Sequence, residues 1–235
     1  MTAPWRHAAD RLVAALRGVF GDRLRSVVAY GSHLDNGAEG PLTSLALVGS
    51  VTVADLEACA RMSPDWQRER IAAPLILPED EFRRSLDAFP LEYGEIMRAH
   101  ELVFGINPFD GISIAREDLR RACETQIKSH LVHLREGYIE SGGRPRAVAD
   151  LVTASAPAFG ALLRNLARLH GADLRDRATA TREGARMAHL PDSVVTDILS
   201  LERPSGMNTT DPARLFPEYL AAVEQLARVV DAWRA

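Results

Sequence analysis

The chain has 235 residues, of which 46% are hydrophobic, enough for a packed core in one large domain or two small ones. Its 28 basic and 32 acidic residues are spread along the chain and give a net charge of −4, so no nucleic-acid-binding face is predicted. The apolar runs are shorter than the roughly 18–20 residues of a membrane helix, and residues 1–17 lack the apolar core of a signal peptide. Cys59 and Cys123 lack the spacing of a disulfide framework or zinc site. We therefore expect a folded, cytoplasmic protein without membrane or nucleic-acid partners.

The first 110 residues alternate between helical and strand-like patterns, which is typical of an α+β domain. The hydrophobic period predicts a helix over residues 5–19 before the first strand. Later short helices are predicted over residues 53–61, closed by Ser63-Pro64-Asp65, and over residues 79–87. Together with these helices we expect a mixed sheet, with strands over residues 24–30, 45–51, 74–77, 89–96 and 102–104.

From Ala115 onward the hydrophobic period is helical almost throughout. Asp211-Pro212 is a typical start for the last helix. Pro108 and Gly111 interrupt both periods, so we place an α/β domain at residues 1–110 and an all-α bundle at residues 111–235. The apolar stripes that predict the bundle's four helices lie in residues 119–138, 159–169, 194–199 and 216–233.

The most informative motif lies at the end of the first strand. Residues 25–30 run directly into Gly31-Ser32, a turn that can present backbone N–H groups and a hydroxyl to a phosphate. A polar loop follows, and then a second apolar run that begins at Ser44. This order resembles the DNA polymerase β-like nucleotidyltransferase superfamily, whose pattern continues from Gly-Ser to Asp-x-Asp. Leu45 and Leu47 stand where the two aspartates of that pattern belong.

Three further segments make the resemblance more specific. Residues 74–78, 83–93 and 100–105 are similar to a bacterial group of nucleotidyltransferase-like proteins that carry a helical C-terminal domain. The resemblance covers about residues 24–140. It implies a nucleotidyltransferase-like mixed sheet with flanking helices, followed by an all-α helical bundle.

The resemblance also implies which chemistry is missing. Nucleotidyl transfer uses two Mg²⁺ ions, held by three carboxylates, to move a nucleoside monophosphate onto an acceptor. By resemblance, Leu45 and Leu47 replace the first two carboxylates, and Glu92 lies near the third position. Glu92 with Ser32 supplies too few oxygen ligands for octahedral Mg²⁺. We therefore expect no metal site and no cofactor, with Gly31 and Ser32 as a vestigial phosphate turn.

Each of these residues also has a purely structural explanation. Gly31 can be a turn glycine and Ser32 a helix N-cap, because serine is favoured there without any phosphate. Strand alternation turns Glu92 away from both neighbours, toward solvent or the vacant cleft. Asp35 and Glu39 are either replacement ligands or solvated loop carboxylates, of which the second is the commoner case.

Two further groups of residues were considered as ligand sites. His130 and His133 are three residues apart on a predicted helix near Glu136 and Glu140, but ordinary surface or core histidines are favoured. An arginine-rich stretch alternates with acidic residues, which favours a solvated face over a phosphate site. Its members are Arg164, Arg168, Arg175, Arg177 and Arg182, with Asp173, Asp176 and Glu183.

Two functional hypotheses follow. In the preferred one, the chain is a non-catalytic pseudoenzyme whose sheet domain is a binding or interaction module, and whose helical domain contacts a protein partner or a second copy. The alternative is an active nucleotidyltransferase that adenylylates a small molecule or a protein through Glu92, Asp35 or Glu39, in which case nucleotide and Mg²⁺ bind. Burial of Leu45 and Leu47 on one strand face is the structural expectation of the first hypothesis.

Overall fold

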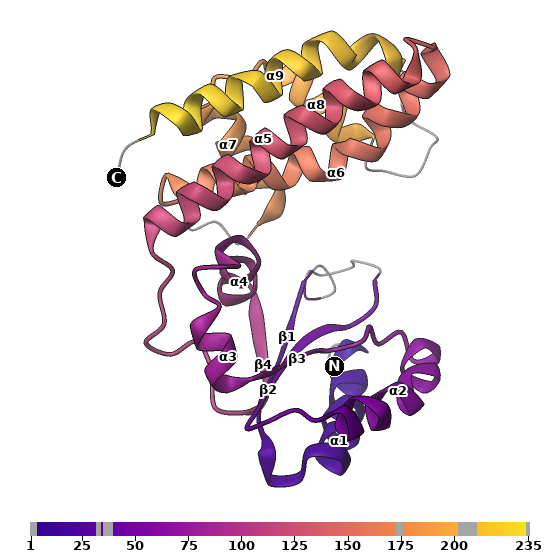
Figure 1. The fold of residues 1–235 in the computed structure, drawn as a ribbon, viewed down its shortest axis with the longest axis vertical. Coiled ribbons are helices and arrows are strands. Elements are labelled where there is room, and N and C mark those ends of the chain that lie inside the picture. The colour runs from indigo at the N-terminus through magenta and orange to yellow at the C-terminus, as the bar shows by residue number, and fades with distance from the viewer. Residues whose placement is uncertain (1–3, 32–33, 35–39, 173–175, 202–210, 234–235) are drawn as a thin grey trace. The chain divides into compact units, whose positions relative to one another are not determined.

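The chain divides into two compact units, Met1–Ile114 and Ala115–Ala235, each described by itself. The computed structural model describes residues 4–31, 34, 40–172, 176–201 and 211–233. The first unit contains a four-stranded sheet with helices, and the described part of the second unit contains only helices (Figure 1). The predicted fold class, a mixed sheet with flanking helices followed by a helical region, is therefore confirmed.

The sheet of the first unit has the strand order β3-β2-β1-β4. β1 pairs antiparallel with β2 and with β4, while β2 pairs parallel with β3, so the sheet is mixed. The two central strands are the most buried, which explains their continuous apolar sequences. The strands are β1 (Leu24–Tyr30), β2 (Thr43–Val48), β3 (Leu75–Pro78) and β4 (His100–Gly105).

One face of the sheet packs against helices α1 (Pro4–Phe20) and α2 (Val53–Arg68). Ala46 of β2 lies in one hydrophobic cluster with Leu16 of α1 and Trp66 of α2. Figure 1 shows these two helices on one side of the sheet and α3 and α4 on the other. The sheet is thus the middle layer of the first unit.

Helix α2 is longer than predicted and continues through Pro64 to Arg68. The expectation that Ser63-Pro64-Asp65 ends the helix is wrong. A proline removes one backbone donor, which leaves the carbonyl of Ala60 without its helical partner, but other contacts can hold the helix. Trp66, in the turn after the proline, is buried against the core and anchors this end of α2.

Residues 89–96 form a helix, so the predicted strand at this position is wrong. Helix α4 (Pro90–Arg98) begins at Pro90, where the fixed φ of proline suits the first helical turn and no N–H is required. Its buried side includes Tyr93 and Ile96, which are three residues apart, a helical spacing.

The expected helix over 79–87 is present as α3 (Glu79–Arg84), and the strand over 102–104 lies within β4.

The second unit is built around helix α6, which packs against all four other helices described in it. Phe159, Leu163 and Leu166 of α6 are almost fully buried. Among the described residues, α6 alone is long and apolar enough to span a membrane, and its packing within the unit accounts for this apolar character. The helices are α5 (Arg116–Ser141), α6 (Pro145–Leu169), α7 (Arg177–Met187), α8 (Asp192–Ser200) and α9 (Pro212–Ala232).

Helix α7 was not expected from the sequence because its buried residues are small and form no apolar stripe. They are Ala180, Thr181, Gly184 and Ala185. A Cβ atom at Gly184 would lie 1.9 Å from the carbonyl oxygen of Leu163 on α6. The two helices can therefore pack this closely only because residue 184 is glycine.

An ion pair joins the start of the sheet to the start of α2. The guanidinium of Arg23 donates to both carboxylate oxygens of Asp55, at 2.8 and 2.7 Å. Asp55 also accepts from the backbone N–H and the hydroxyl of Thr52, both at 2.8 Å, in a capping box. Hydrogen bonds from Arg23 and Thr52 hold the pKa of the Asp55 carboxyl well below its usual range.

We predict that Asp55→Ala lowers the free energy of unfolding, measured by urea denaturation at a series of pH values. The folded-state pKa is depressed below the unfolded value of about 3.9, so the contribution of the carboxylate is complete above about pH 5. This contribution is lost as the pH falls toward the folded-state pKa. The difference in unfolding free energy between wild type and variant should therefore become smaller there. Asp65→Ala, which removes an exposed ion pair of the same helix, is the control and should have little effect. A difference in unfolding free energy that grows below pH 5 would contradict the prediction.

Candidate functional site

The second face of the sheet, here called the leucine face, presents Val28, Leu45 and Leu47. Val28 of β1 lies directly opposite Leu45 of β2, and Leu47 is two residues further along the same strand. The side chains of Leu45 and Leu47 are 0% and 2% exposed, which confirms the prediction that both are buried. The positions that the superfamily resemblance gives to metal-binding aspartates are therefore occupied by core leucines.

Four side chains bury the leucine face, and we call them the covering layer: Phe82 of α3, Tyr93 and Ile96 of α4, and Phe109 of the turn after β4. The Phe82 ring makes edge-to-face contacts with Tyr93, at 5.0 Å between ring centroids, and with Phe109, at 5.9 Å. Burial of a leucine in such a layer contributes about 1.5–3 kcal/mol. The leucine face is largely apolar. The hydroxyl of Ser26, directly opposite Leu47, is buried without a hydrogen-bond partner among the described residues, but a single hydroxyl does not make a site for a hard cation.

The polar atoms of the covering layer and its border are engaged in structural hydrogen bonds. Ser85 donates its hydroxyl to the carbonyl of Phe82 at 3.0 Å, so the Tyr93 hydroxyl donates to Ser85 Oγ, also at 3.0 Å. His100 Nδ1 lies 3.1 and 3.0 Å from the carbonyl oxygens of Ile96 and Met97, at the end of α4. These bonds fix α3 and α4 over the sheet.

Glu92 lies on the exposed side of α4. Its neighbour Tyr93 belongs to the covering layer, and successive side chains of an α-helix differ in direction by about 100°. Glu92 therefore points to solvent. The sequence left solvent and the cleft both open for a strand, but the helical conformation of α4 is what directs this side chain outward. The structure does not bring Glu92 into the cluster that contains Leu45 and Leu47.

The Gly-Ser turn is described only in part. Gly31 directly follows β1 and has a φ of 97°, a conformation that favours glycine, and its carbonyl accepts from the N–H of Leu34 at 3.1 Å. The turn glycine is thus required by the backbone. Ser32, Asp35 and Glu39 lie outside the described residues, and their roles as phosphate or metal ligands stay predictions.

The two histidines considered as metal ligands have other partners. Burial lowers the pKa of His130 to about 4, and its Nε2 atom lies 2.7 Å from the hydroxyl of Tyr219. That hydroxyl donates to the carbonyl of Ser155 at 3.2 Å, so the proton of the neutral imidazole lies at Nε2. His133 is exposed and contacts Glu136. No group of three or more His, Cys, Asp or Glu side chains suited to a metal occurs in the part of the chain that is described.

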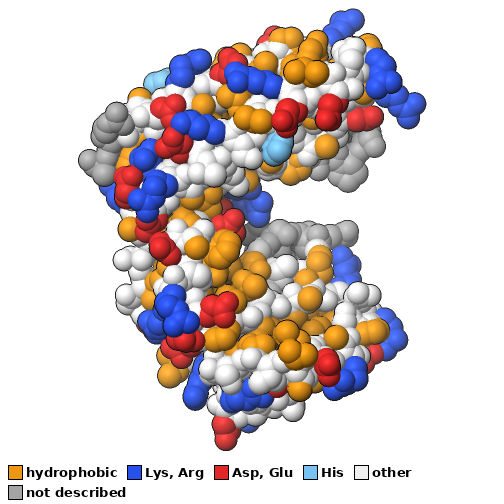
Figure 2. Space-filling view, viewed as in Figure 1, with side chains coloured by type: hydrophobic (Ala, Val, Ile, Leu, Met, Phe, Trp, Pro, Cys, Tyr) orange, Lys and Arg blue, Asp and Glu red, His pale blue; other side chains and the backbone are white. Residues whose placement is uncertain are grey.

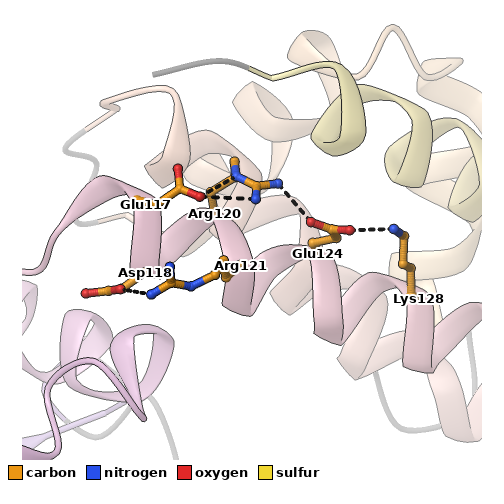
Figure 3. Close-up of polar contacts among 6 residues, drawn as sticks. All are labelled: Glu117, Asp118, Arg120, Arg121, Glu124 and Lys128. Atoms are coloured by element: carbon orange, nitrogen blue, oxygen red, sulfur yellow. Dashed lines mark hydrogen bonds and ion pairs between the residues drawn. The ribbon is translucent and has the colours of Figure 1, made fainter.

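Charged side chains on the second unit largely compensate one another. On α5, Arg120 contacts both Glu117 and Glu124, and Glu124 also contacts Lys128 (Figure 3). Figure 2 shows basic and acidic side chains interspersed over the visible surface of this unit. On this visible face the mixture of signs differs from the single-sign basic patch that is typical of nucleic-acid binding.

The arginine-rich stretch does not form one continuous face. Arg164 and Arg168 are half-buried on α6, whereas Arg177 and Arg182 are exposed on α7. Asp173 and Arg175 lie outside the described residues. Asp176 caps α7 by accepting from the N–H of Thr179 at 2.7 Å, and Glu183 pairs with Arg186. These acids therefore have local structural roles.

Comparison with solved structures defines the class of fold. No family model and no curated protein sequence matches the chain. Its fold is nucleotidyltransferase-like, with a helical C-terminal region. It is similar to spectinomycin adenyltransferase AAD(9) from Enterococcus faecialis, whose crystal structure contains ATP and spectinomycin, with a TM-score of 0.59 and 11% identity. The similarity covers 93% of this chain and 98% of that one, and at this identity it shows the fold alone.

The covering layer was missed by sequence reasoning because residues 89–96 were assigned to a strand. The available signal was Phe89-Pro90, a helix start with proline at the first position, followed by Tyr93 and Ile96 at helical spacing. Phe82 and Phe109 carry no comparable local signal, since their packing partner Leu47 is far away in the sequence.

We predict that the double variant Leu45→Asp and Leu47→Asp loses several kcal/mol of unfolding free energy, because each carboxylate would be buried without a partner. The measurement is urea denaturation followed by circular dichroism. Leu102→Asp is the matched control: Leu102 lies opposite Val28 on β4 but is 41% exposed, so this carboxylate stays in water. A double variant as stable as wild type would show that the leucine face is open to solvent.

Proposed function

We propose that the chain is a nucleotidyltransferase-like protein that has lost metal-dependent nucleotidyl transfer and acts as a binding or interaction module. The observation that carries this proposal is the burial of Leu45 and Leu47 under the covering layer. Two-metal transfer needs carboxylate ligands in a cavity that admits water, Mg²⁺ and a triphosphate. At this position the chain has a close-packed apolar interior, so we expect no metal and no cofactor.

The proposal includes a protein partner or a second copy at the helical unit, and a cytoplasmic location. Val132 and Ile139 on α5 are 48% and 77% exposed, and they support a contact surface in that unit. The mixed charges of α5 support a protein as the partner over nucleic acid.

The alternative function is adenylyl transfer to a small molecule or a protein through carboxylates in unusual places. It is supported by the fold similarity to an adenyltransferase whose structure contains ATP and spectinomycin. It requires Glu92, Asp35 or Glu39 to replace the missing ligands. Glu92 is exposed on α4 and separate from the leucine-face cluster, which favours the first proposal.

Calorimetric titration with ATP, in the presence and absence of Mg²⁺, distinguishes the two functions. We expect no binding tighter than about millimolar, or about −4 kcal/mol, because no metal offsets the charge of the triphosphate. AAD(9) titrated under the same conditions is the positive control. Micromolar, Mg²⁺-dependent binding that Ser32→Ala abolishes without a change in circular dichroism would overturn the proposal and establish the alternative.

A further inference from the structure

Helix α2 carries an apolar stripe on its exposed side. Val53 is 72% exposed and Leu56 is 50% exposed, and Ala60 and Pro64 follow at helical spacing and are exposed as well. These four residues are called the α2 stripe. The core-facing side of α2, which includes Trp66, already fills the interior of the first unit, so the α2 stripe is not needed for that packing.

Two charged residues border the α2 stripe. Glu57 and Arg61 are exposed and one helical turn apart, on the helix surface beside Val53 and Ala60. In the described part of the chain, neither side chain has an ion pair or hydrogen bond. By contrast, the next acid along the same helix, Asp65, is paired within its own chain. The charges of Glu57 and Arg61 are thus available to another molecule.

We propose that the α2 stripe is a self-association surface, on which α2 of a second copy packs antiparallel about a two-fold axis. The α2 stripe and the Glu57/Arg61 pair have nearly the same midpoint, at residues 58–59. Antiparallel packing about this midpoint brings Val53 against Pro64 of the second copy and Glu57 beside Arg61 of the second copy. Symmetry repeats both contacts. The surface is therefore complementary to itself in the positions of its apolar residues and its charges.

The same charges favour the antiparallel arrangement over the parallel one. Glu57 and Arg61 lie on the same flank of the α2 stripe, so in a parallel pair the two copies of this flank would lie on opposite sides of the contact and the charges would not meet. One helix pair buries less than the roughly 1,200 Å² of a stable interface, so the association is weak and depends on protein concentration. This inference does not depend on the loss of catalysis, because α2 lies on the sheet face opposite the leucine face.

Sedimentation velocity of the full chain, from about 5 to about 500 µM, tests the inference. Wild type should shift from monomer to dimer in this range, and Leu56→Glu should weaken the dimer by about tenfold or more, since it buries an unpaired charge. Glu57→Arg and Arg61→Glu should each weaken it as well, because each places like charges in contact. An equimolar mixture of these two variants should dimerise again, since opposite charges then meet across the interface.

Ile106→Glu is the matched control, since Ile106 is 79% exposed and lies after β4, outside α2. It should leave the dimer unchanged. All the substituted residues are exposed, so circular dichroism should match wild type for every variant. A monomer at all concentrations, a dimer that Leu56→Glu does not weaken, or a mixture of the charge variants that stays monomeric would each overturn the inference.

Discussion

The apolar contact between the leucine face and the covering layer is the constraint on which the first unit depends. Because β1 and β2 are buried on both faces, their sequences are almost continuously apolar, as in a sheet enclosed by two layers. The same contact places α3 and α4, since Phe82, Tyr93 and Ile96 meet Leu45 and Leu47 there. A carboxylate at either leucine would have to be buried without a partner or force the covering layer away. The positions of Leu45 and Leu47 can therefore hold either a packed apolar core or metal-binding carboxylates, but not both.

The parts of the fold that could be predicted are those in which local pattern and tertiary burial agree. The strand over residues 24–30 coincides with β1, because a fully buried strand shows an unbroken apolar run. Where residue types are ambiguous, prediction failed. Leu91 and Tyr93 alternate as in a strand, yet Pro90 and the contacts of Tyr93 with the sheet favour α4. In α7 the buried residues are too small to form a hydrophobic stripe, and only the close approach to Leu163 reveals their role.

At the candidate site, the chemical character of Leu45 and Leu47 could be predicted from the sequence, but the packing around them could not. That Leu45 and Leu47 cannot themselves bind a metal ion can be read from the sequence, because a hydrocarbon side chain cannot bind a hard cation in any conformation. The residues that cover Leu45 and Leu47 could not be predicted from the sequence. The covering layer comes from α3, α4 and the turn at Phe109, which are distant from Leu45 along the chain and contact it only in the folded structure. The direction of the Glu92 side chain could not be predicted either. Whether it faces the cleft or solvent follows from the secondary structure of residues 90–98.

The similarity to an adenyltransferase at 11% identity shows that this fold can be kept while most of the sequence differs. A backbone of this kind is maintained by many dispersed apolar contacts, whereas metal-dependent transfer depends on two or three carboxylates. A leucine in a buried strand adds apolar burial and brings no repulsion between like charges, so a sheet of this kind needs no metal site for its stability. Exposed apolar residues that the core does not use, such as Val53 and Leu56 of α2, are the features that a purely structural role leaves unexplained.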